Sequence, residues 1–238
     1  MTEEQRKKLN VPASKLPVFE EPTDFRASLH WKVFRIMAEM VDGWQFIADF
    51  KKTVTFFGSA RFPENNKWYK TAEQLGKLLA EHGFGVITGG GPGIMEGGNR
   101  GAHEAGGTSV GLNIKLPAEQ RINPYVNASI AFHYFFTRKV MLSYAAQAYV
   151  YFPGGFGTLD EFFELVTLIQ TKKIATHIPV ILLGREYWGP LNEWIRTQVY
   201  GTFHAIDEED MNIYQIVDTS EEALEIILKT PERKDLGY

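Results

Sequence analysis

One short segment of the sequence, PGGFGTLDE at 153–161, combines backbone freedom with two carboxylates. The apolar run AYVYF precedes it and the helical pattern FFELVTLIQ follows it, so we expect a strand to turn here into a helix. The first N–H groups of a helix have no partner within the helix and lie at the positive end of its dipole, which suits a phosphate. The glycine turn is therefore a candidate anion site.

The two acids of this segment allow two interpretations. Glu161 falls in the first turns of the expected helix, where its side chain can point back toward a ligand held by the glycines. Asp160 is expected to face elsewhere, because neighbouring residues of a helix are about 100° apart. Alternatively, both acids only complement the helix dipole.

Two bases begin the preceding helix, in the segment TRKVML. Arg138 and Lys139 stand at the helix end where acids are preferred. Either they form a solvated basic face, or they face an anionic ligand, to whose oxygens arginine can make forked hydrogen bonds. The second interpretation also explains why cations stand at this position.

Two further glycine segments, FFGSAR at 56–61 and TGGGPGIME at 88–96, also follow expected strands. In a parallel sheet all three turns lie at the same edge, where such sheets bind ligands. The alternative is that they are tight turns without a ligand. There is no G-x-x-x-x-G-K-[ST] loop, and no acid clearly serves as a ribose ligand after the second segment, so a mononucleotide fits better than NAD.

The elements that must position these residues alternate between strands and helices. This alternation predicts an α/β, Rossmann-like, doubly wound and mostly parallel sheet with helices on both faces. We expect a flexible arm at 1–22 and a single domain at 23–238 with N- and C-terminal helical extensions. The expected helices lie at 24–50 (with Gly43 as a candidate break), at 67–82, after the glycines at 89–93, at 137–146, from the last glycine turn to 171, within 186–201 and at 219–229, and the expected strands lie at 53–57, 84–88, 108–114, 129–136, 148–152 and 178–184.

The bulk composition excludes several classes of function. The chain of 238 residues has a net charge of −4, so it lacks the excess of basic residues expected of a protein that binds nucleic acid or an anionic membrane. It contains no cysteine, which excludes disulfides and thiolate metal sites. No apolar run of about 18 residues occurs and the N-terminus lacks an apolar targeting segment, so we expect a cytoplasmic protein.

Three motifs together resemble one known family. TGGGPGIME, RKVML and, fifteen residues after Arg138, PGGFGTLDE resemble the LOG family, the cytokinin riboside 5′-monophosphate phosphoribohydrolases, long mislabelled lysine decarboxylases. The resemblance covers about residues 53–184, and TLIQTKK and EYWGPLNEW resemble its longer bacterial members. It implies a homodimer or larger homo-oligomer that hydrolyses the N-glycosidic bond of a nucleoside 5′-monophosphate, AMP or a cytokinin nucleotide, with no metal or cofactor.

The resemblance also implies roles for individual residues. It makes Arg138 and Glu161 the essential pair. A methionine of the family pattern is replaced by Leu142, with Met141 one place earlier, and an upstream substrate contact aligns with Glu119 or Gln120. The residues implied to bind substrate are Gly58, Ser59, Gly90, Gly91, Gly93, Met95, Lys139, Gly155, Phe156, Gly157, Thr158 and Thr167.

Such a reaction builds positive charge on the ribose while the base departs. A carboxylate near C1′ can stabilise that charge and activate water, which is the role expected of Glu161. The alternative is a non-catalytic nucleotide or ADP-ribose sensor or carrier, whereas the family's older label, lysine decarboxylase, is rejected on chemical grounds. Such a decarboxylase normally needs pyridoxal phosphate on a lysine, for which Lys139 is the only candidate in the motifs.

Overall fold

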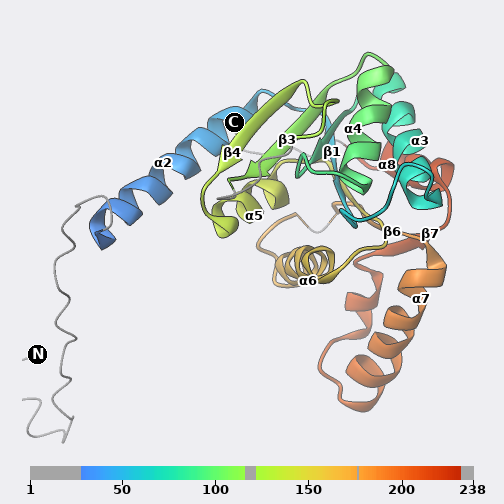
Figure 1. The fold of residues 1–238 in the computed structure, drawn as a ribbon. Coiled ribbons are helices and arrows are strands. Elements are labelled where there is room, and N and C mark those ends of the chain that lie inside the picture. Colours follow the sequence, from blue (N-terminus) through green and yellow to red (C-terminus); the bar gives the residue numbers. More distant parts are fainter. Residues whose placement is uncertain (1–27, 116–121, 176, 232–238) are drawn as a thin grey trace, which may run out of the picture. The chain divides into compact units, whose positions relative to one another are not determined.

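The computed structural model describes residues 28–115, 122–175 and 177–231 (Figure 1). The chain divides into two compact units, Met1–Met37 and Ala38–Tyr238. The predicted arm at 1–22, Glu119 and Gln120 lie outside the described residues. The first described helix, α2 (Leu29–Ala48), confirms the N-terminal helical extension and passes through Gly43 without a break.

The second unit is built on a sheet in which every neighbouring pair of strands is parallel. The seven strands described lie in the order β4-β3-β2-β1-β5-β6-β7, so the order reverses between β1 and β5. The strands are β1 (Thr53–Phe57), β2 (Gly85–Thr88), β3 (Ser109–Ile114), β4 (Ala128–Phe132), β5 (Ala148–Tyr151), β6 (Val180–Leu183) and β7 (Gln215–Val217). The doubly wound parallel sheet predicted from the sequence is confirmed.

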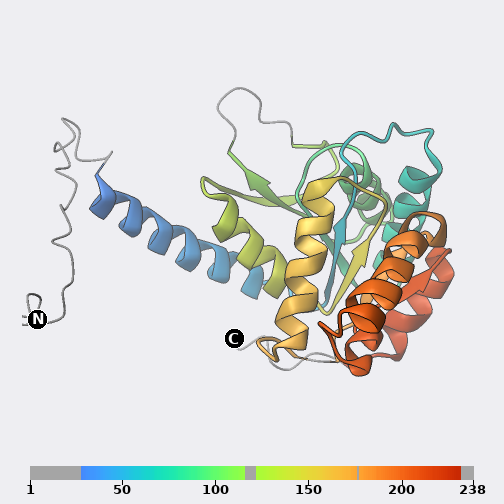
Figure 2. The same ribbon diagram turned by 90° about the horizontal axis from the view of Figure 1, so that it is seen from below.

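Helices cover both faces of this sheet (Figures 1 and 2). One face carries α3 (Lys67–Glu81), α4 (Ile94–Glu104) and α8 (Ser220–Lys229). The other carries α5 (Phe135–Tyr144) and α6 (Phe156–Gln170). Strand β1 serves both layers, because Val54 and Phe56 belong to one core and Phe57 to the other, as the two-residue period of a strand requires.

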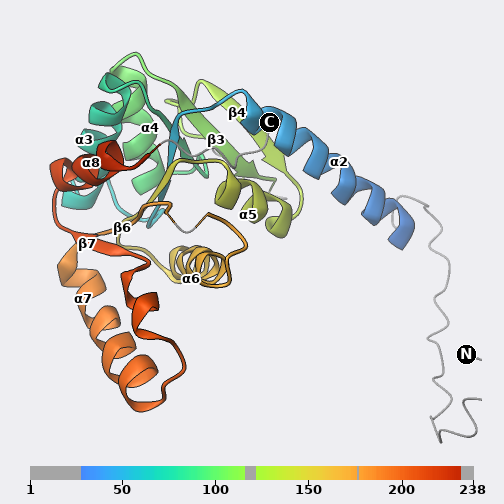
Figure 3. The same ribbon diagram turned by 180° about the vertical axis from the view of Figure 1, so that it is seen from behind.

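The segment after β6 extends away from the sheet before it returns (Figure 3). Helix α7 (Arg185–Trp194) continues into a π-helical segment (Ile195–Thr202), and a 3₁₀ turn (Glu208–Asn212) precedes β7. Helix α8 begins with a capping box, in which the Thr219 hydroxyl accepts from the Glu222 N–H and the Glu222 carboxylate accepts from the Thr219 N–H. Strand β7 was not predicted, because three residues are too few to show a period.

One predicted boundary is wrong. The apolar run at 129–136 was assigned to a single strand, but β4 ends at Phe132 and Phe135 already begins α5. A short apolar run cannot separate a strand from the first turn of a helix. Helix α5 therefore starts two residues before the predicted position, and this shift places Arg138 in its second turn rather than its first.

Helices α3 and α4 approach each other closely through glycines. A Cβ atom on Gly101 would lie 1.9 Å from the Glu73 carbonyl oxygen, and one on Gly76 would lie 2.4 Å from the Gly98 carbonyl oxygen. Gly101 follows the turn at 88–93 along the sequence and Gly76 precedes it in α3, and the role of both is the contact between the two helices. This contact fixes α4 and with it the loop that precedes it.

We predict that Gly101→Ala lowers the free energy of unfolding by about 1–3 kcal/mol, because the new methyl group must push the α3 backbone away. Urea unfolding measures the change. The matched control is Gly157→Ala in the first turn of α6, where an added Cβ would meet no atom within 4 Å and the φ angle is not positive. This variant should be unchanged or up to about 1 kcal/mol more stable, and equal losses in the two variants would contradict the packing argument.

Candidate active site

Three loops meet at the carboxyl ends of the strands, where the strand order reverses. The Ser59 N–H after β1 donates to the Pro153 carbonyl after β5 at 3.0 Å. The Ile94 N–H at the start of α4 donates to the Ser59 carbonyl at 3.0 Å. The loop after β1 is thus tied to both of the others, as expected for the ligand-binding edge of a doubly wound sheet.

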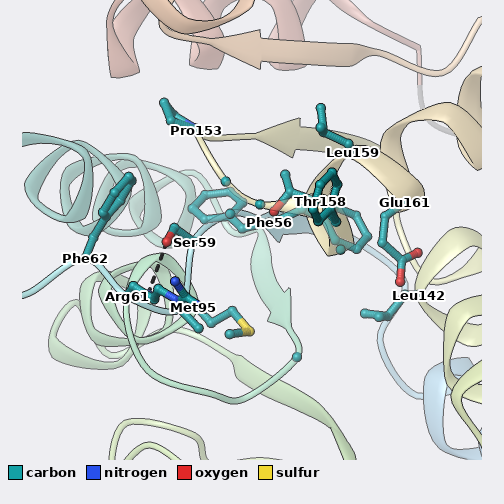
Figure 4. Close-up of a pocket in the computed structure, with 18 of the residues that line it drawn as sticks. Phe56, Ser59, Arg61, Phe62, Met95, Leu142, Pro153, Thr158, Leu159 and Glu161 are labelled. Carbon is teal, nitrogen blue, oxygen red and sulfur yellow. Dashed lines mark hydrogen bonds between the residues drawn. The ribbon is translucent and has the colours of Figure 1, made fainter.

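A cavity of about 820 Å³ opens between these loops (Figure 4). Its volume falls in the range of about 300–1,000 Å³ that is usual for small-molecule sites. Glu161 lies beside Leu142 on one side of the cavity, across from Arg61 and Met95. The lining residues are 56–62 and 153–159 together with Gly89, Met95, Arg138, Leu142, Glu161 and Tyr187.

The start of helix α6 lines this cavity, and no side chain caps its first N–H groups. Gly155 is the N-cap residue, its position makes no side-chain cap, and the first turn contains no acid. A Cβ atom added to Gly155 or Gly157 would meet no atom within 4 Å, and neither residue has a positive φ. Packing and backbone strain therefore do not explain these two glycines, whereas the approach of a ligand to the first N–H groups does.

The second glycine loop is different, because the protein itself explains its glycines. Gly90 and Gly93 have φ angles of +71° and +72°. An added Cβ would lie 1.9 Å from Asn113 Oδ1 at the first position and 2.3 Å from the Ser59 carbonyl oxygen at the second. The main role of these glycines in this structure is to shape the turn.

The peptide groups of the same loop are also engaged by protein. Asn123 donates its N–H to the Gly90 carbonyl at 2.9 Å and its side-chain amide to the Gly91 carbonyl at 3.0 Å. The predicted substrate contacts Gly90, Gly91 and Gly93 are not among the lining residues of the cavity, and this loop contributes Gly89 and Met95 to it.

Arg138 and Glu161 both line the cavity and both carry a buried polar atom without a hydrogen-bond partner, Nε of the arginine and Oε2 of the glutamate. Burial lowers the pKa of Arg138, an effect that the charge of Glu161 opposes. Burial raises the pKa of Glu161 from its ordinary value of 4.5 to about 7, against the opposing effect of the Lys139 charge. Buried groups left without partners and shifted in pKa at a cavity are typical of a functional site.

Lys139 and Thr167 lie apart from this pair. Lys139 Nζ is 2.8 Å from Asp160 and 2.9 Å from Glu164. With Thr167, whose hydroxyl donates to the Phe163 carbonyl, these residues line a separate and more open hollow. Arg138 and Lys139 diverge because neighbouring residues of a helix are about 100° apart. Asp160 faces away from the cavity, as expected, and is paired there with Lys139.

Several lining residues were not predicted as site residues, and two of them, Tyr187 and Arg61, carry polar side chains. The Tyr187 hydroxyl donates to the Gly154 carbonyl at 2.6 Å and so supports the glycine turn from helix α7. Nothing in the local sequence around Tyr187 indicates this contact, since the two residues are 33 positions apart. Arg61, in contrast, directly follows the first glycine turn, and that position was a usable signal for a second cation at the cavity.

The structure also bears on metals and membranes. Within the described residues, no group of three or more His, Asp or Glu side chains could hold a metal ion. No helix in the same part of the chain is long and apolar enough to cross a membrane. The homo-oligomer and the cytoplasmic location stay predictions.

Comparison with known proteins gives both a family and a fold. A family described as "Possible lysine decarboxylase" matches residues 95–227. The protein named "Cytokinin riboside 5'-monophosphate phosphoribohydrolase LOG" from Oryza sativa subsp. japonica is 30% identical over 190 residues, which cover 77% of this chain and 74% of the rice protein.

Two solved structures show the same arrangement of strands and helices. A protein designated TM1055 is 31% identical, with a TM-score of 0.56 over 75% of this chain and 99% of the other. The molybdenum cofactor carrier protein of Chlamydomonas reinhardtii is 24% identical, with a TM-score of 0.55 over 75% of this chain and 98% of the other. At this level of identity the second similarity concerns the fold alone.

The raised pKa of Glu161 predicts a pH-dependent stability that does not require a substrate. A carboxyl group whose pKa is raised by folding contributes stability that is fully present below its unfolded pKa of 4.5 and is lost as the pH rises through about 7. The free energy of unfolding of the wild type should therefore fall relative to that of Glu161→Gln between pH 5 and pH 8, by up to about 3 kcal/mol.

Urea unfolding at several pH values measures this difference. Glu209→Gln, which alters an exposed acid in the 3₁₀ turn, controls for the loss of one negative charge. A constant difference between wild type and Glu161→Gln across this pH range would contradict the burial argument.

Proposed function

Because the chain belongs to the LOG family, we propose that it hydrolyses the N-glycosidic bond of a nucleoside 5′-monophosphate to the free base and ribose 5-phosphate. The name of the rice relative supports phosphoribohydrolase activity at the level of the family. The observation that carries the proposal is that Arg138 and Glu161 line one cavity with the uncapped start of α6, and that each has a buried atom without a partner. A sugar phosphate has oxygens that can accept from Arg138 and from the first N–H groups of α6, and hydroxyl groups that can donate to Glu161.

The 5′-phosphate would bind at the start of α6. The N–H groups of Phe156, Gly157 and Thr158 are the ones left without intrahelical partners there, and the helix dipole favours an anion. Tyr187 holds the turn in place through Gly154. Binding of the phosphate positions the ribose over the cavity, where the scissile bond can approach Glu161.

Glu161 would act on the water that attacks C1′. As the C1′–N bond breaks, its electron pair leaves with the base, positive charge develops on the ribose, and the carboxylate stabilises that charge. The same carboxylate takes a proton from the attacking water, and the departing base nitrogen takes up a proton from solvent. A pKa of about 7 suits a group that must be ionised to act and must then hold a proton.

Arg138 would orient the substrate rather than transfer a proton. Its guanidinium is in the same cavity as Glu161 and can donate to ribose or phosphate oxygens. The charges of Lys139 and, to a smaller extent, Arg138 lower the pKa of Glu161 and so oppose the effect of its burial. Met95 and Leu142 supply apolar wall, which supports a purine base, and AMP or a cytokinin riboside monophosphate is the proposed substrate.

Lysine decarboxylation fits the site less well. A Schiff base with pyridoxal phosphate requires a lysine amine that is available to the cofactor. Lys139 is paired with Asp160 and Glu164 and lies outside the lining of the large cavity. That cavity has no lysine among its lining residues in the described part of the chain.

The test is to incubate the protein with AMP, GMP, CMP, UMP and N6-isopentenyl-AMP and to measure the released base by chromatography. Glu161→Gln should lower kcat by about 10²–10⁴, the usual contribution of a general base. With the best substrate, kcat/KM should rise with pH through an apparent pKa near 7, because the ionised carboxylate is the active form.

Asp160→Asn is the matched control, since it alters the neighbouring acid, whose side chain is 62% exposed. It should change kcat by less than about threefold, as expected for an exposed ion pair. Tight binding of the nucleotides without release of any base would contradict the hydrolase proposal and support a nucleotide carrier instead.

A further inference from the structure

Glu39, in the N-terminal helix α2, contacts the start of helix α5. Its carboxylate accepts from the backbone N–H of His133 at 2.7 Å and of Tyr134 at 3.3 Å. It also accepts from the Thr137 hydroxyl at 2.7 Å. These residues are more than 90 positions away in the sequence, and all of them belong to the second compact unit.

Helix α5 lacks these interactions in its own sequence. Its N-cap residue Tyr134 makes no side-chain cap, and its first turn contains no acid. The helix instead carries Arg138 and Lys139 immediately after that turn, close to the positive end of the dipole. The Glu39 carboxylate therefore supplies both the hydrogen-bond acceptors and the negative charge that the start of this helix would otherwise lack.

The packing of α2 holds Glu39 in this place. Gly43 and Ile47 follow Glu39 at intervals of four residues and so share its face of the helix. A Cβ atom on Gly43 would lie 2.8 Å from the Met141 side chain, and Ile47 is fully buried in the core that contains Met141. Helix α2 is thus packed along the side of α5 and is not a separate appendage at this point.

Helix α5 in turn connects Glu39 with the cavity. Thr137 is fully buried, and its hydroxyl lies within hydrogen-bond distance of two acceptors, the Glu39 carboxylate and the Tyr134 carbonyl. The next residue, Arg138, lines the cavity, as does Leu142 one turn later. A shift at the start of α5 would therefore move the guanidinium directly.

We propose that Glu39 is a positioning residue for Arg138, acting through the start of α5. The expected effect of Glu39 on KM and kcat rests on the proposed function. Its expected effects on the stability of the start of α5 and on nucleotide affinity do not require catalysis. Because Glu39 belongs to the N-terminal helix α2, this proposal gives that helix a role at the site.

The first experiment compares wild type, Glu39→Gln and Asp42→Asn. Asp42 is an exposed acid on the same helix and serves as the matched control. Hydrogen exchange measured by mass spectrometry should be about tenfold faster in the peptide that covers 133–138 in Glu39→Gln, and unchanged in Asp42→Asn. Calorimetric titration with AMP, carried out with Glu161→Gln added to each of the three proteins so that AMP is not hydrolysed during the measurement, should show affinity about tenfold weaker only where Glu39→Gln is present.

The second experiment asks whether the effect passes through Arg138. In an Arg138→Ala background, Glu39→Gln should cause no further loss of AMP affinity, because the residue through which it acts is gone. An equal loss in both backgrounds would overturn the proposal, and so would an unchanged exchange rate in Glu39→Gln. A role in global stability alone would lower the urea midpoint while leaving AMP affinity and local exchange as in wild type.

These readouts separate the two proposals. If the wild-type protein binds AMP but releases no base, the hydrolase proposal fails, and AMP affinity and exchange still test Glu39. If turnover is observed, Glu39→Gln should raise KM more than it lowers kcat, because misplacement of Arg138 weakens substrate binding first. A fall in kcat with KM unchanged would overturn the assignment to positioning.

Discussion

The parallel direction of the strands is the constraint from which the site follows. Because every pair in the sheet is parallel, the loops after β1, β2 and β5 emerge at one edge, and the reversal of strand order leaves a gap between the connections on the two sides of β1. Two hydrogen bonds through Ser59 then tie the three loops together. Arg138 and Glu161 lie at this edge because they belong to α5 and α6, the helices before and after β5.

Glycine has two distinct uses in these loops. At Gly90 and Gly93 a side chain is excluded by the backbone angle and by neighbouring atoms. At Gly155 and Gly157 there is room for a side chain, and what a side chain would obstruct is access to the first N–H groups of α6. The same residue type therefore shapes one loop and exposes the other.

Much of the architecture could be predicted from local patterns, because strands such as TVTFF at 53–57 and helices such as α6 have clear hydrophobic periods. The pairing of Arg138 with Glu161 in one cavity came from family motifs rather than from the periodicity. What could not be predicted depends on distant neighbours. The partner of Tyr187 is one example, and the surroundings that distinguish Gly90 from Gly155 are another. The separation of Lys139 from Arg138 can be predicted from the helical period, because neighbouring residues of a helix are about 100° apart.

The contact of Glu39 with α5 has a consequence in terms of thermodynamic linkage. If the placement of α2 favours the form of α5 that binds nucleotide, then nucleotide binding must favour that placement of α2 by the same factor. Val41, which lies two residues after Glu39 in α2, has an exposed apolar side chain. A molecule that bound this part of α2 with different affinity in its two placements would then be coupled in free energy to nucleotide binding.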